Sequence, residues 1–265
     1  MPGMSSRQPL RFEDQVALVT GSGRGIGRAI AVKLASEGAS VIVNYFRNRA
    51  GAEETASAVE ALGRRVTIVR ANVGEISGID QLFEAAQEEF GRLDILVCNA
   101  ASGYNRPAME QKPRGWDWTM NINARSLLFC AQRAVPLMVQ GGSIVSLSSP
   151  GATRVLPEYV VVGASKAAIE ALTRYLGVEL APRGIRVNAV SPGVVETEAL
   201  RHFHSLQGED SFARLAARTP AGRLATPEDV ANVVAFLCSP DAAMICGQTI
   251  VADGGYTLPV DPPHN

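Results

Sequence analysis

The sequence predicts an α/β protein with one doubly wound, seven-stranded parallel sheet and helices on both faces, for three reasons. Short apolar runs alternate with helical patterns almost without interruption along the 265 residues. The apolar runs are rich in Val and Ile without polar alternation, which is typical of strands buried on both faces. The connections between them are short, so the strand–helix–strand crossovers should be right-handed.

The first half of the chain has four apolar runs, each followed by a helical pattern. The expected strands are VALVT, VIVNY, VTIVRA and LDILVC, at 16–20, 41–45, 66–71 and 93–98. Helices are expected where apolar residues recur at helical spacing, at 26–38, 52–63 and 79–91, and a long one near 116–140.

The second half supplies the remaining strands, SIVSLS, IRVNAVS and QTIVAD, at 143–148, 185–191 and 248–253, and a helix over 163–181. One long polar interruption, 195–225, separates the last two strands and would have to be functional or mobile in a compact domain. We therefore expect one domain over 1–265, since no linker or repeat divides a chain that is 46% hydrophobic.

Composition excludes several classes of protein. A net charge of −1 without charge runs argues against nucleic acid or a membrane surface as partner. The first residues lack an apolar signal region and no apolar run approaches ~18 residues, so a cytoplasmic protein is expected. Cys98 and Cys130 are expected to be core thiols. His202 and His204 stand one residue apart with no third ligand in sight, so no metal site is predicted.

The segment TGSGRGIG, residues 20–27, follows the first strand directly and opens the first helix. Gly21, Gly25 and Gly27 would let the backbone approach a pyrophosphate at the positive end of that helix, as in a Rossmann-type dinucleotide site. We expect the cofactor to contact most of this turn, including Ser22, Arg24 and Ile26. The alternative is a tight strand-to-helix turn without a ligand.

The end of the second strand indicates which cofactor is used. NAD enzymes of this fold place Asp or Glu there to bind the ribose hydroxyls. This chain has Asn-Tyr-Phe-Arg at 44–47, and the first acid afterwards is Glu53. Arg24 and Arg47 without a carboxylate suit a 2′-phosphate, so NADPH is predicted. The alternative is that Arg47 and Arg49 are solvated residues at the start of a helix and do not bind the cofactor. We adopt this interpretation for Arg49.

Four further motifs accompany the glycine turn: CNAA at 98–101, MNINARS with Asn123, SLSS with Ser149, and SPGVVET at 191–197. Together they resemble the short-chain dehydrogenase/reductase family over nearly the whole chain, although Ala101 replaces the family's glycine. The resemblance implies a catalytic serine at Ser149 and a helix-kinking asparagine at Asn123. It also implies cofactor contacts beyond the glycine turn, from Asn72, Val73, Asn99, Ala100, Ala101, Lys166, Pro192, Gly193, Val195 and Thr197.

The catalytic tyrosine is displaced in this sequence. Six residues separate Tyr159 from Lys166, and Val162 stands where the family's tyrosine would normally be. Treated as helical, the phenol would move ~4.5 Å along the axis and ~60° around it. In a 2-enoyl thioester the hydride goes to Cβ and charge gathers on an oxygen two bonds further away. A displaced phenol suits that substrate better than a ketone.

Within the family, the sequence is most similar to the third type of enoyl-acyl-carrier-protein reductase, which has Tyr-x6-Lys. The segments that carry this likeness are NAASG at 99–103, 116–132, 162–182 and TPAGR at 219–223. The resemblance implies reduction of trans-2-enoyl thioesters by NADPH in a cytosolic homo-oligomer, commonly a tetramer. The apolar residues of 195–225 would then form a substrate lid over the acyl chain.

Roles can be assigned on this basis. Lys166 should hold the nicotinamide ribose and lower the pKa of a nearby phenol. Tyr159 should donate a hydrogen bond to the thioester carbonyl. Ser149 either binds substrate or merely ends a strand, whereas Asn123 supports a helix kink or a water near Lys166. Two alternatives stay open: a 3-ketoacyl or other carbonyl reductase, and a non-catalytic sensor that only binds the cofactor.

The helix over 163–181 is apolar around much of its circumference, through Ile169, Leu172, Leu176 and Leu180, which predicts a symmetric oligomer. Tyr175 on the same helix is expected to pack.

Overall fold

A computed structural model describes residues 10–196 and 211–259 of the chain. One sheet of seven parallel strands has the order β3-β2-β1-β4-β5-β6-β7, which confirms the predicted doubly wound arrangement. The strands are β1 Val16–Val19, β2 Ser40–Tyr45, β3 Val66–Arg70, β4 Ile95–Cys98, β5 Gly142–Leu147, β6 Ile185–Pro192 and β7 Thr249–Ala252.

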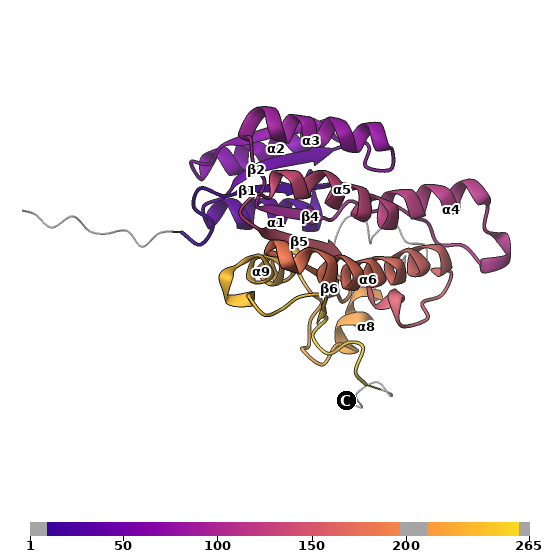
Figure 1. The fold of residues 1–265 in the computed structure, drawn as a ribbon. Helices are drawn as coiled ribbons and strands as arrows, with labels where there is room; N and C mark the ends of the chain where they lie inside the picture. The colour runs from indigo at the N-terminus through magenta and orange to yellow at the C-terminus, as the bar shows by residue number, and fades with distance from the viewer. Residues whose placement is uncertain (1–9, 197–210, 260–265) are drawn as a thin grey trace, which may run out of the picture.

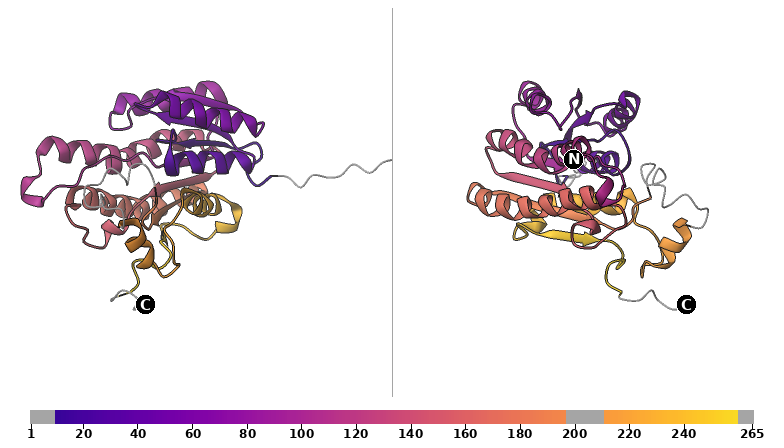
Figure 2. Two further views of the ribbon diagram at one scale, coloured as in Figure 1. Left: turned by 180° about the vertical axis from the view of Figure 1, so that it is seen from behind. Right: turned by 90° about the vertical axis from the view of Figure 1, so that its right-hand side faces the viewer.

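Helices cover both faces of the sheet (Figures 1 and 2). The core on one face includes residues of α1, Gly25–Ser36, α2, Arg49–Ala61, and α9, Pro227–Cys238. The core on the other face includes residues of α3, Ile76–Phe90, α5, Ser126–Ala134, and α6, Val160–Leu180. Successive residues of a strand point to opposite faces, so the Val- and Ile-rich strands supply both cores.

The expected long helix near 116–140 is not continuous. It begins earlier, with α4 at Pro113–Met120, passes through a π-helical segment, η2, at Asn121–Arg125, and continues as α5. It ends in a short 3-10 turn, η3, at Val135–Leu137, where a proline interrupts regular helix. The π-helical segment contains Asn123, the asparagine at which the resemblance implies a kink, so the helix is irregular at this residue.

The shorter elements lie in the connections. They are the 3-10 turns η1 Ala108–Glu110, η4 Pro150–Ala152, η5 Ala181–Arg183 and η7 Pro240–Ala242, and helix α8 Ser211–Ala217. Residues 197–210 of the expected lid, with His202 and His204, lie outside the described residues. Within the described ranges, no helix has the length and apolar character needed to cross a membrane.

Helix α6 corrects one expectation about packing. Ile169 and Leu176 are buried in the core, and Leu172 and Leu180 pack against it. Tyr175, which was expected to pack, is 70% exposed, so that prediction is wrong. Its neighbour on the exposed side, Val178, is 77% exposed. The exposed apolar surface of α6 therefore includes Tyr175 and Val178. The isoleucine and leucines on which the oligomer prediction was based lie in the core or against it.

Candidate active site

The candidate site lies at the carboxyl edge of the sheet, where four neighbouring parallel strands end. β1, β4, β5 and β6 lead into the glycine turn, the 99–101 segment, Ser149 and the Pro192–Gly193 turn, respectively. Because parallel strands end at the same edge, residues from distant parts of the chain meet there.

The glycine turn is shaped for a close approach of backbone. Gly21 adopts φ +64°, and a Cβ there would lie 3.0 Å from Ala100 Cα. A Cβ on Gly27 would collide with the carbonyl oxygen of Gly21. Helix α1 begins at Gly25 without a side-chain cap and without an acid in its first turn. Its first N–H groups are therefore available to an anion, so the residues present fit a nucleotide pyrophosphate.

Two asparagines and a threonine fix this turn. The Asn44 Oδ1 accepts from the Gly21 N–H at 3.0 Å, and its Nδ2 donates to Ala71 O at 3.1 Å. The Asn99 Nδ2 donates to Thr20 O at 2.9 Å and to Gly21 O at 3.1 Å. Sequence reasoning missed Asn44 and Thr20. The available signal was an amide inside an apolar strand, which has to find partners when buried.

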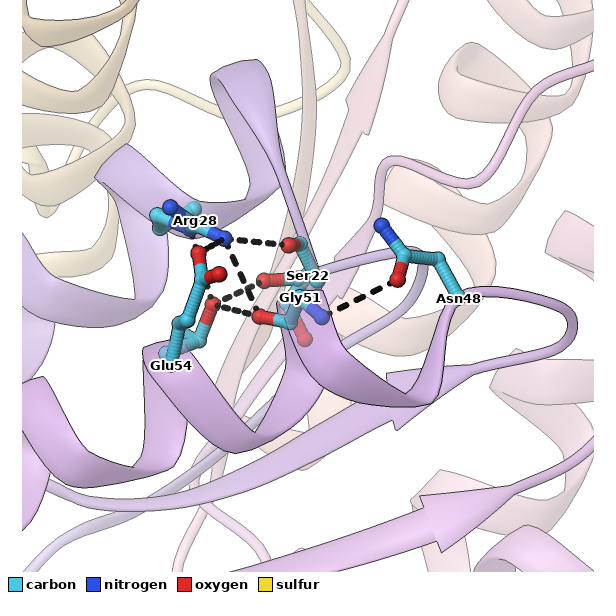
Figure 3. Close-up of polar contacts among 7 residues, drawn as sticks. Ser22, Arg28, Asn48, Gly51 and Glu54 are labelled. Carbon is cyan, nitrogen blue, oxygen red and sulfur yellow. Dashed lines mark hydrogen bonds and ion pairs between the residues drawn. The ribbon is translucent and has the colours of Figure 1, made fainter.

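A polar cluster missed at the sequence level joins this turn to α2 (Figure 3). The Arg28 Nη2 donates to Gly23 O at 2.9 Å and Gly51 O at 3.1 Å, and it pairs with Glu54 at 2.7 Å. Asn48 caps α2 by accepting from the Gly51 N–H at 3.0 Å. The first turn of α2 is thereby held against the glycine turn.

Arg47 lies between β2 and the start of α2, and no carboxylate accompanies it there. Arg24 and Arg47 are exposed, and the Arg47 guanidinium lies 5.7 Å from the Phe46 ring centroid and 6.0 Å from that of Trp118. Stacking of this kind leaves the edge of a guanidinium able to bind an anion. Arg49 instead pairs with Glu53 at 2.7 Å, as expected for a residue at a helix start.

The remaining expected cofactor residues are placed as follows. Asn72 shapes the turn after β3, accepting from the Gly74 N–H at 3.1 Å, and Val73 is buried. Gly193 packs so closely on Asp253 that a Cβ would lie 2.8 Å from its Cα. Val195 forms an isolated bridge with Ala225. Ser22 is buried, Ile26 and Asn99 are half-buried, Ala101 is exposed, and Thr197 lies outside the described residues.

Tyr159 precedes α6 instead of lying in it, so treating its displacement as a step along a helix is wrong. Its hydroxyl donates toward Ser149 Oγ at 3.5 Å, whereas O–H···O bonds are usually about 2.7 Å. Ser149 Oγ also accepts from the Gly151 N–H at 3.2 Å. The two hydroxyls are thus neighbours without a strong bond between them, and both can still donate to a third oxygen.

Val162 occupies the position at which the family's tyrosine would stand. The side chain is 7% exposed, and its Cγ2 lies against Gly103, where a Cβ would collide with it. Val162 therefore packs α6 against Gly103.

Lys166 and Asn123 are held by hydrogen bonds of their own. The Lys166 Nζ donates to Leu147 O at 2.7 Å, and burial lowers its pKa to about 8. The Asn123 Nδ2 donates to Ser102 O and Ser165 Oγ, both at 2.9 Å. Asn123 therefore ties the π-helical segment to the residue next to Lys166 in sequence.

The electrostatics of Tyr159 differ from the sequence-based expectation. Burial raises the pKa of its phenol, and the hydrogen bond with Ser149 opposes that rise. Lys166 is not among the causes, so the expectation that its ammonium lowers the pKa of this phenol is wrong for this structure. A phenol with a raised pKa stays protonated at neutral pH and is a hydrogen-bond donor.

Cys98 and Cys130 are buried, which confirms that they are core thiols. Within residues 10–196 and 211–259, no group of three or more His, Cys, Asp or Glu side chains could hold a metal ion.

Comparisons with known proteins agree with this geometry. The family model described as "Enoyl-(Acyl carrier protein) reductase" matches residues 21–257. The chain is 41% identical to 1-cyclohexenylcarbonyl-CoA reductase of Streptomyces collinus, over 94% of this chain and 89% of that protein.

Two solved structures share the fold. A short-chain alcohol dehydrogenase of Sinorhizobium meliloti, described as putative, has a TM-score of 0.88 at 38% identity, covering 94% of this chain and 98% of its own. A 7α-hydroxysteroid dehydrogenase with NADH and 7-oxo glycochenodeoxycholic acid also has a TM-score of 0.88, at 30% identity, covering 96% and 98%. The chain belongs to the short-chain dehydrogenase/reductase family, in its enoyl-acyl-carrier-protein reductase-like branch, and is an oxidoreductase of the reductase type.

Proposed function

We propose that this protein uses NADPH to reduce the 2,3 double bond of trans-2-enoyl thioesters of acyl carrier protein or coenzyme A, as in fatty-acid or polyketide-type biosynthesis. One observation carries the proposal. Tyr159 lies beside Ser149, while Val162 fills the position of the ordinary tyrosine. We infer from this displacement of the phenol that it serves an oxygen away from the carbon that receives the hydride.

The residues divide the work as follows. When bound, the nicotinamide cofactor supplies the hydride for Cβ of the enoyl group. Tyr159, kept protonated by its raised pKa, donates a hydrogen bond to the thioester carbonyl as negative charge gathers there. Ser149 donates to the same oxygen or holds the phenol in place. Lys166 would hold the ribose hydroxyls of the cofactor from beneath.

The identity of the cofactor is proposed from charge. Arg24 and Arg47 flank the region in which a 2′-phosphate would lie, and no carboxylate follows β2 before α2 begins. A phosphate gains from two guanidinium groups, whereas the ribose hydroxyls of NADH would lack the usual acidic acceptor. The uncapped start of α1 would hold the pyrophosphate.

A relative supports the substrate class. The name of the Streptomyces collinus reductase describes a coenzyme A thioester with a ring double bond next to the carbonyl. The direct test is NADPH consumption with crotonyl-CoA against acetoacetyl-CoA, with NADPH binding measured in parallel. A higher kcat/KM for crotonyl-CoA supports the proposal. Turnover of acetoacetyl-CoA alone would contradict it, and binding without turnover of either would favour a sensor.

Carbonyl reduction is the second candidate, and two observations favour it. Ser149 is retained within 3.5 Å of the tyrosine hydroxyl, as a ketone oxygen would need. One structural relative was solved with a 7-oxo bile acid. In that case the enzyme would act on 3-ketoacyl thioesters or other ketones.

We propose in addition that the protein is a cytoplasmic homo-oligomer, a tetramer by resemblance to its family. Tyr175 and Val178 expose apolar surface on α6, at 70% and 77%, and exposed apolar patches often mark interfaces between proteins. Light scattering at micromolar concentration tests this, because a mass near the 28.1 kDa of one chain would contradict it.

A further inference from the structure

We propose that Glu158 is a positioning residue whose left-handed backbone turns Tyr159 toward Ser149. This inference rests on the proposed role of Tyr159. Glu158 has φ +59°, and in the described part of the chain only it and Asp14 show a positive φ without being glycine. Side chains such as Glu seldom adopt this conformation, because Cβ then crowds the following carbonyl oxygen.

The strained residue stands immediately before the tyrosine. Tyr159 has φ −99° and ψ 12°, and the first helical residue of α6 is Val160. A tyrosine four residues before Lys166 would lie within α6 and take its direction from the helix. Tyr159 lies outside it, so the turn at Glu158 sets the direction of the phenol.

Backbone hydrogen bonds hold the turn in place. The Arg106 N–H donates to Glu158 O at 2.9 Å, which ties the turn to the segment after β4. The Tyr159 N–H donates to Leu156 O at 3.3 Å, and the Gly163 N–H donates to Tyr159 O at 2.7 Å. Glu158 itself is exposed. Substitutions there act mainly through the backbone conformation that they allow.

In this orientation the Tyr159 ring packs against two glycines, Gly151 and Gly163. A Cβ on Gly151 would lie 2.6 Å from both Cδ1 and Cε1 of Tyr159, and a Cβ on Gly163 would lie 3.7 Å from Cδ1. We attribute the position of the Tyr159 ring beside these glycines to the turn at Glu158. Strain kept by surrounding contacts at such a point is typical of functional sites.

The test compares residues by their tolerance of the left-handed region. Glu158→Gly and Glu158→Asn keep that conformation accessible, Glu158→Gln changes only the charge, and Glu158→Val opposes the conformation because it is β-branched. Glu110→Val, at an exposed residue with ordinary φ, is the matched control. Glu158→Thr serves as a second β-branched variant if Glu158→Val does not fold.

Three quantities are measured for each variant: kcat with crotonyl-CoA, the Kd of NADPH, and the ultraviolet titration of Tyr159, taken as the difference from Tyr159→Phe. We expect Glu158→Val to lower kcat roughly 10- to 100-fold, as a small misplacement can. It should leave the Kd of NADPH unchanged and shift the phenol titration. The Gly, Asn and Gln variants and the control should resemble the parent.

Normal kcat and titration in the β-branched variants would overturn the inference. So would losses in Glu158→Gly and Glu158→Asn equal to those of Glu158→Val, because the side chain would then matter instead of the backbone. If the parent protein reduces no enoyl thioester, the proposed function fails. The phenol titration needs no substrate and still decides the inference about Glu158.

Discussion

Replacing Tyr159 with Phe removes one oxygen and little else. The ring packs beside Gly151 and Gly163, and Phe keeps that packing. Among the residues that the structure describes, the lost hydroxyl has one hydrogen-bond partner, Ser149 Oγ at 3.5 Å, which is too distant for a strong bond. Folding should therefore be nearly unchanged, with a loss of stability below about 1 kcal/mol.

Catalysis should respond differently. Removing a donor that stabilises developing oxyanion charge costs about 2.7–4 kcal/mol, or ~10²–10³ in kcat. Turnover of crotonyl-CoA by NADPH measures this effect, fluorescence titration measures NADPH affinity, and thermal unfolding checks the fold. Ser149→Ala is a useful companion because it removes the other hydroxyl of the pair.

The expected pattern is a loss of kcat with NADPH affinity preserved, because the phenol is not assigned to the cofactor. Near-normal enoyl turnover by Tyr159→Phe would refute the argument from the displaced tyrosine. If ketones were then the better substrates, carbonyl reduction would replace enoyl reduction as the proposed function.

The other predictions concern the neighbouring residues. Val162→Tyr should not rescue Tyr159→Phe, because a phenol at residue 162 would point at Cβ of the enoyl group instead of its carbonyl oxygen; recovery of enoyl turnover in the double variant would contradict this. Arg47→Ala should lower the affinity for NADPH ~10- to 100-fold, or ~1.5–3 kcal/mol, and leave the affinity for NADH nearly unchanged. Equal losses of affinity for both cofactors in binding titrations would exclude a contact with the 2′-phosphate. Burial lowers the pKa of Lys166 to about 8, so its ammonium is present below that pH and is lost as pH rises through it. The kcat/KM for NADPH, which reports groups of the free enzyme, should accordingly decline above about pH 8, and a flat profile would contradict the assigned role of Lys166.

Titration of Lys166 should change the free energy of unfolding in the opposite direction to activity. In the unfolded chain this lysine would have a pKa near 10.4, so between about 8 and 10.4 the unfolded state binds the additional proton. Stability should therefore rise with pH across that window as far as Lys166 is concerned. Activity lost above pH 8 would thus not be explained by unfolding through this residue.

The fold was predictable because it depends on pattern more than on detail. Every expected strand is present within a residue or two of its predicted bounds, since runs such as VALVT can be buried only in the middle of the sheet. The expected long helix was the exception. Apolar periodicity does not distinguish a regular helix from one with a π-helical segment. Only the match of Asn123 to the family's helix-kinking asparagine indicated that the helix would be irregular.

The site was less predictable, because its geometry depends on backbone outside regular elements. Sequence identified Tyr159, Lys166 and Ser149 by their spacing, but it placed Tyr159 on a helix that in fact begins at Val160. It could not identify Arg28, because two of its partners are the backbone carbonyl groups of Gly23 and Gly51, which any residue type supplies. Nor could it show that burial dominates the pKa of the Tyr159 phenol.

Two local features together account for the presence of valine at residue 162 and of tyrosine at residue 159. At residue 162 the valine side chain packs closely against Gly103. At residue 159 the ring finds its space above Gly151, and the left-handed turn at Glu158 directs it there. A tyrosine moved back to 162 would therefore have to turn its ring away from Gly103 or displace the backbone there. A variant with the ordinary spacing should thus place its phenol away from Gly151, where we expect it to serve a ketone instead of an enoyl thioester.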